Sequence, residues 1–75
     1  MKNLQRAYVI GQDAINNSNA VATDALQLYN DKRFIEAANK FIEAGNINFV
    51  EYSHFENAAS AYFLAGDYEL SLIHI

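Results

Sequence analysis

The side chains best suited to chemistry in this chain are its two histidines, one of which stands close to a carboxylate. Glu51 precedes His54 by three residues, and a Glu-x-x-His spacing on a helix forms half of the carboxylate-bridged di-iron site of helix bundles. A complete site needs a second such pair and two further glutamates, whereas the residue three before His74 is Ser71. Because the ligand set is incomplete, we expect no metal to bind. We expect His54 to lie at the surface.

No other residue pattern indicates catalysis. The chain has no cysteine, and therefore neither a disulfide nor a thiolate ligand. It has no glycine-rich phosphate-binding loop either. No motif that activates a nucleophile surrounds any of the serines, which are Ser18, Ser53, Ser60 and Ser71. We therefore predict no catalytic residue, no cofactor and no enzymatic activity.

Composition and charge narrow the classes of partner. Five basic residues against nine acidic ones give a formal net charge of −4, and the basic residues form no sustained stripe, which argues against binding a nucleic-acid backbone. Although 52% of the residues are hydrophobic, no apolar run approaches the roughly 18 residues of a membrane span. Gln5 and Arg6 interrupt the apolar segment that a signal peptide requires. If Met1 is the true start, the cytoplasm is the default expectation.

Apolar and small residues recur in one register along the chain. Four residues of the first copy have a counterpart 34 positions later, which is the tetratricopeptide period; the pairs are Val21 and Phe55, Ala25 and Ala59, Leu28 and Tyr62, and Phe34 and Tyr68. The small residue allows a partner helix to approach, and the large ones bury apolar surface, worth roughly 25 cal/mol per Å². The register predicts an all-α chain of antiparallel helix-turn-helix units. The alternative is an ordinary antiparallel helix pair within some other all-helical fold.

In these residues the chain resembles part of a tetratricopeptide repeat (TPR) protein. The segment RFIEAANKFIEA places Phe34, Ala37, Phe41 and Ala44 in the family order of aromatic, small, aromatic and small, and the second copy begins similarly with AGDYE. The resemblance implies an α-solenoid fragment of about four to five helices. Its parts would be an N-terminal helix at 1–17, which could end a preceding repeat, a first repeat at 18–51 and a second, incomplete repeat at 52–75. The chain departs from the family at three positions, where Leu, Gly and Pro are preferred: Asp24, Lys32 and Phe49.

The first break between helices is expected in the polar cluster NNSN at 16–19. Such residues favour turns and caps over helix interiors, and Ser18 or Asn19 would be the N-cap of the next helix. The first repeat helix is then expected at 20–29.

The turn and the second repeat helix have their own signals. Asp31 is placed to cap a helix from Lys32 to Ala44, and Gly45 is expected to end that helix in the left-handed conformation. On its surface Glu36 and Lys40 are predicted to pair, with the acid first.

The third helix has two candidate starts. Ser53 with Glu56 forms a capping box, whereas the apolar segment before it favours a start near Asn48.

The resemblance also directs attention to one helix surface. One TPR subgroup grips carboxylates with basic residues and Asn on the inward face of each repeat's first helix, but Ala22, Leu26, Glu56 and Ser60 stand at those places here, so that clamp is not carried over. The candidate peptide-binding surface, suited to an apolar or weakly basic peptide, consists of Ala22, Leu26, Tyr29, Glu56, Ser60 and Phe63. The alternative is that Tyr29 and Phe63 pack against neighbouring repeats.

The repeat pattern is lost after Glu69. The final residues 70–75, LSLIHI, resemble the translation of an adapter sequence used to tag DNA libraries, which must be excluded from fold reasoning; the alternative is a genuine short apolar helix start. A 75-residue chain has a marginal core, and an incomplete repeat leaves an open apolar edge, predicted at Tyr62 and Tyr68. We hypothesise a fragment of a longer array or a small chain that self-associates through that edge.

The function expected from the resemblance is protein–protein interaction or scaffolding without catalysis. The alternatives are a regulatory repeat region of a larger enzyme or sensor and a self-associating structural subunit.

Overall fold

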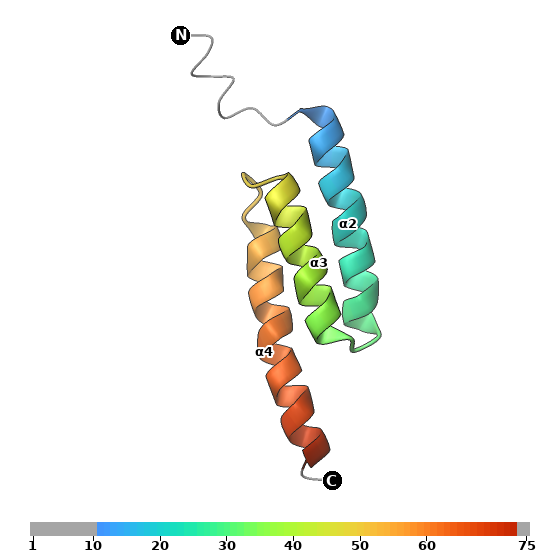
Figure 1. Cartoon of the computed structure of the whole chain (residues 1–75), viewed down its shortest axis with the longest axis vertical. Coiled ribbons are helices and arrows are strands. Elements are labelled where there is room, and N and C mark those ends of the chain that lie inside the picture. Colours follow the sequence, from blue (N-terminus) through green and yellow to red (C-terminus); the bar gives the residue numbers. More distant parts are fainter. Residues whose placement is uncertain (1–10, 74–75) are drawn as a thin grey trace.

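The computed structural model describes residues 11–73, apart from the side chains of 71 and 73. This part of the chain forms three helices and contains no strand: α2 (Gln12–Asn30), α3 (Phe34–Ile47) and α4 (Ser53–Ile73). The helices run up and down, with α3 packed against both α2 and α4, and the C-terminal part of α4 extends beyond the turn between α2 and α3 (Figure 1). The prediction of an all-α chain is confirmed. Three helices are seen here where four to five were expected, and residues 1–10 of the expected N-terminal helix lie outside the described residues.

The core is built almost entirely from alanine. Ala25 of α2, Phe41 of α3 and Ala58 of α4 form one buried cluster that joins all three helices. Small side chains at the contact let helix axes approach closely, but they bury little apolar area, so the core of this small chain is marginal. The remaining core residues are also alanines: Ala37, Ala38, Ala44, Ala61 and Ala65.

The expected break at 16–19 is absent, because α2 runs through it without interruption. Ser18 is fully buried, and its hydroxyl donates a hydrogen bond of 2.9 Å to the carbonyl oxygen of Ile15. This bond satisfies the serine inside the helix, so neither Ser18 nor Asn19 is an N-cap. Gly11 occupies the N-cap position of α2. The first repeat helix therefore begins well before residue 20.

Lys32 makes the turn between α2 and α3. Its φ of 64° is the only positive φ of a non-glycine residue in the described part of the chain. The Lys32 N–H donates to the carbonyl of Tyr29, and the Arg33 N–H donates to that of Leu28, which together form a Schellman motif. Asp31 is accordingly the C-cap of α2. The prediction that Asp31 caps the next helix is wrong, since Arg33 is the N-cap of α3.

Gly45 lies inside α3 and is buried, so the prediction that it ends this helix is wrong. A Cβ atom at Gly45 would lie 2.6–2.9 Å from three atoms of the Phe55 ring. The glycine therefore leaves room on α3 for the aromatic ring of Phe55 from α4. α3 ends two residues later, at Ile47.

α4 begins at Ser53, which confirms the later of its two predicted starts. The second copy of the repeat pattern predicts a turn near Gly66, but α4 continues through this position. Gly66 has no positive φ. The segment AGDYE is therefore helical here.

Two ion pairs lie on the exposed surface of α3. Glu36 pairs with Arg33, at 2.6 Å between Oε2 and Nη2, and Lys40 pairs with Glu43 at 3.3 Å. The predicted pairing of Glu36 with Lys40 is wrong, because the Glu36 carboxylate pairs with Arg33 and Lys40 pairs with Glu43 instead. Exposed pairs of this kind contribute about 0–1 kcal/mol.

Candidate peptide-binding groove

A shallow groove lies between α2 and α4, with a volume of about 490 Å³. Tyr29 of α2 lines one side, and Ser60 and Phe63 of α4 line the other, together with Ala59 and Leu64. Three residues of the predicted surface are thus brought together. Ser60 and Phe63 lie three residues apart and therefore share one face of α4, which lies opposite Tyr29 across the groove.

Tyr29 joins the groove to the core. It is half-buried and packs against the Ala25, Phe41 and Ala58 cluster and against a second buried cluster, which consists of Ala37, Ala38 and Ala61. It also makes an edge-to-face contact with Phe34, with ring centroids 5.4 Å apart. Tyr29 therefore both packs against the core and lines the groove. Phe63 differs, since it is 71% exposed.

The other three predicted residues do not line the groove. Ala22 is half-buried against the Ala25, Phe41 and Ala58 cluster. Leu26 is 52% exposed on α2, and Glu56 is exposed one helical turn before Ser60. The predicted surface is therefore only partly brought together by the fold.

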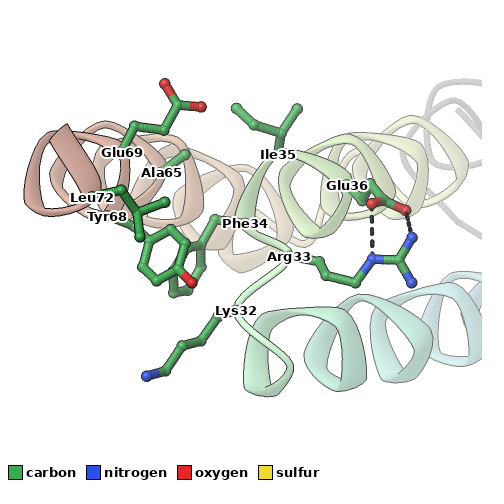
Figure 2. Close-up of a pocket in the computed structure, with 9 residues that line it drawn as sticks. All are labelled: Lys32, Arg33, Phe34, Ile35, Glu36, Ala65, Tyr68, Glu69 and Leu72. Carbon is green, nitrogen blue, oxygen red and sulfur yellow. Dashed lines mark hydrogen bonds and ion pairs between the residues drawn. The ribbon is translucent and has the colours of Figure 1, made fainter. Parts of the chain in front are cut away.

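A second hollow, of about 280 Å³, separates the start of α3 from the end of α4 (Figure 2). Its interior is apolar, with the Phe34 and Tyr68 rings in edge contact at 5.9 Å and Leu72 beside them. The Arg33–Glu36 pair points away from these rings (Figure 2). Of the four charged residues that line this hollow, Arg33 and Glu36 pair with each other, and Lys32 and Glu69 lie at its edge.

His54 is buried, at 5% exposure, so the expectation of a surface histidine is wrong. Its Nε2 is buried without a hydrogen-bond partner, as is the Oδ1 of Asn48. The signal that sequence reasoning missed was periodicity, because His54, Ala58, Ala61 and Ala65 fall on one helix stripe. Glu51, the other half of the Glu-x-x-His pattern, is exposed before α4 begins.

Two further searches covered the described part of the chain. Within residues 11–73 no group of three or more His, Cys, Asp or Glu side chains is placed to hold a metal ion. Over the same residues no helix is both long and apolar enough to cross a bilayer, as predicted.

Comparisons with protein-family models, with curated proteins and with solved structures find no match to this chain.

Proposed function

We propose that this chain is a non-catalytic, TPR-type protein-interaction or scaffolding module that binds a peptide in the groove between α2 and α4. The observation that carries the proposal is the meeting of Tyr29, Ser60 and Phe63 in one groove. A mostly apolar concavity with a few polar groups is the usual form of a binding site. Phe63 is the expected anchor, since exposed aromatic residues dominate binding energies.

The repeat arrangement within this proposal rests on the internal register and on the first hairpin. α2 and α3 pack side by side and are joined by the short turn at Lys32. Within them the small residue Ala25 meets the aromatic Phe41, as the repeat pattern requires. The second copy reproduces the pattern along α4 as far as Tyr68. A longer array, in which this chain is a fragment, would accommodate both copies.

One observation favours a second candidate function, a small self-associating subunit. Tyr62 and Tyr68, where an open repeat edge was predicted, are 42% and 39% exposed on α4. The core is also small enough for an added interface to matter. A regulatory repeat region of a larger enzyme or sensor would use the same groove as the main proposal.

The proposal is tested by panning a phage-displayed random peptide library against the whole chain and measuring the affinity of the enriched peptides. Phe63→Ala is expected to weaken binding about tenfold or more, the loss typical of a hot-spot aromatic. Phe49→Ala is the matched control, because Phe49 is 52% exposed in the connection before α4, outside the groove. Failure to enrich peptides, or equal losses in both variants, would overturn the proposal.

A further inference from the structure

The connection between α3 and α4 exposes three large apolar side chains. Phe49, Val50 and Tyr52 are 52%, 44% and 74% exposed, and together they are called the connection patch below. The Glu51 N–H donates a hydrogen bond of 3.2 Å to the carbonyl oxygen of Asn48, so the patch is carried on a hydrogen-bonded turn. Neighbouring exposed aromatic and aliphatic side chains of this kind are typical of a surface that another segment covers.

Residues 1–10 join the helices at the same end of the bundle as the connection patch. The start of α2 and the connection between α3 and α4 both lie at this end, and the turn between α2 and α3 lies at the other (Figure 1). Gly11, the N-cap of α2, has an extended backbone with φ −64° and ψ 155°. The helix therefore starts after Gly11, and the preceding segment need not follow its axis.

The length of this segment is sufficient to cross the end of the bundle. Packed helix axes lie about 8–10 Å apart, and the order α2, α3, α4 places two such steps between the start of α2 and the connection. Ten residues of extended chain span up to roughly 33–36 Å. Residues 1–10 can therefore reach from Gly11 over α3 to the connection patch.

The composition of residues 1–10 suits an apolar surface with acidic surroundings. The segment reads MKNLQRAYVI, and its charged residues, Lys2 and Arg6, are both basic. Its larger apolar side chains include Leu4, Tyr8 and Ile10.

The end of the bundle that carries the connection patch has the opposite charge. Asp13 in the first turn of α2, Glu51 in the connection and Glu56 in the first turn of α4 are all exposed. No Lys or Arg stands in these three places or in the last turn of α3. Two helix N-termini and one C-terminus at this end add only about half a positive charge between them. The three carboxylates therefore leave this end acidic.

We propose that residues 1–10 dock across this end of the bundle and cover the connection patch. The apolar side chains of the segment lie over Phe49, Val50 and Tyr52, and its two basic residues lie beside the carboxylates. A tethered segment has an effective concentration in the millimolar range, which favours it over a second copy of the chain. The docked segment leaves the groove between α2 and α4 open, so this inference is independent of the proposed function.

The experiment locates the segment by nuclear magnetic resonance in the whole chain. Because the chain has no cysteine, Asn3→Cys can carry a single spin label, which broadens the amide signals of residues close to it. Beyond the start of α2, we expect the strongest broadening at residues 49–52, and we expect it to decrease as salt screens the charges. The proposal is wrong if the strongest broadening falls on the groove residues of α4 or is spread evenly over the three helices.

Two variants of the spin-labelled chain test the patch itself. Tyr52→Ser removes an aromatic side chain of the patch and is expected to remove most of the broadening at residues 49–51. Leu70→Ser is the matched control, because Leu70 is 56% exposed near the other end of α4, and it is expected to leave the broadening unchanged. Circular dichroism establishes that both variants are folded. Equal losses in the two variants would contradict the proposal.

A mixed sample distinguishes docking within one chain from docking between chains. Spin-labelled chains are mixed with isotope-labelled chains that carry no spin label, and only the second kind is observed. We expect no broadening at residues 49–52 in this sample. Broadening there would mean that the segment of a second copy covers the patch, which would overturn the intramolecular assignment.

Discussion

Lys32 holds the turn between α2 and α3 in a backbone conformation that glycine adopts more easily. A left-handed residue with a Cβ atom is strained by roughly 1–2 kcal/mol, whereas glycine loses an extra 0.5–1 kcal/mol or so of unfolded-state entropy. We expect Lys32→Gly to raise the free energy of unfolding by roughly 0.5–1 kcal/mol, measured by urea denaturation. Lys32→Ala removes the charge and keeps the strain at φ 64°. If Lys32→Ala stabilises the chain as much as Lys32→Gly, strain at this residue is not the cause.

Individual residues show where sequence reasoning succeeds and where it fails. Phe41 and Ala44 were placed on the repeat pattern through the family resemblance, and both are buried. Ser18 and Gly45 were assigned from local propensity, and both assignments are wrong because tertiary packing decides their roles. Ser18 is buried and bonded within its helix, and Gly45 receives a ring that is ten positions further along the chain. His54 was rejected as a metal ligand and then expected at the surface, although its periodicity placed it among the core residues.

α4 is the helix on which the two copies of the repeat pattern disagree with each other. Gly66 stands 34 positions after Lys32, yet Lys32 forms a turn and Gly66 is helical. If α4 is continuous, Gly66→Ala is expected to raise the free energy of unfolding by roughly 0.5–1 kcal/mol, since alanine favours a helix interior. Urea denaturation measures the change. Ala59→Gly, at another exposed position of α4, should lower the free energy by a similar amount.

The opposite sign for Gly66→Ala would mean that the chain turns at Gly66 as it does at Lys32. A Cβ atom strains a left-handed residue, so alanine would then be destabilising. That result would support a second hairpin and contradict the continuous α4.

Helix ends were predicted well where a turn is set by the local sequence and poorly elsewhere. The end of α2 at Asn30 and the start of α4 at Ser53 lie within one residue of expectation. The start of α2 was missed because Ser18 is buried and bonded inside the helix despite the polar residues around it. Helical periodicity assigned Tyr29, Ser60 and Phe63 to a candidate surface. It could not show that these residues are neighbours, because the alignment of α2 against α4 is set by packing.

The chain as a whole is acidic and has a core of small side chains. We expect its melting temperature to stay constant over about a hundredfold range of protein concentration, because stability depends on concentration only when folded chains associate. The acidic residues of α4 oppose such association at neutral pH. Scanning calorimetry with circular dichroism at the lower concentrations would measure this. A melting temperature that rises with concentration would instead support the self-associating subunit.

The lack of basic residues along α4 also affects how fast a partner arrives. Glu56, Asp67 and Glu69 lie along α4, and a surface of one charge sign attracts an oppositely charged molecule before contact is made. Encounter with a basic peptide would be accelerated at low ionic strength and would slow as salt screens the field. Dissociation of a peptide would depend instead on how well it packs against the residues that line the groove. Association and dissociation rates can thus be changed separately, the first through surface carboxylates and the second through side-chain size.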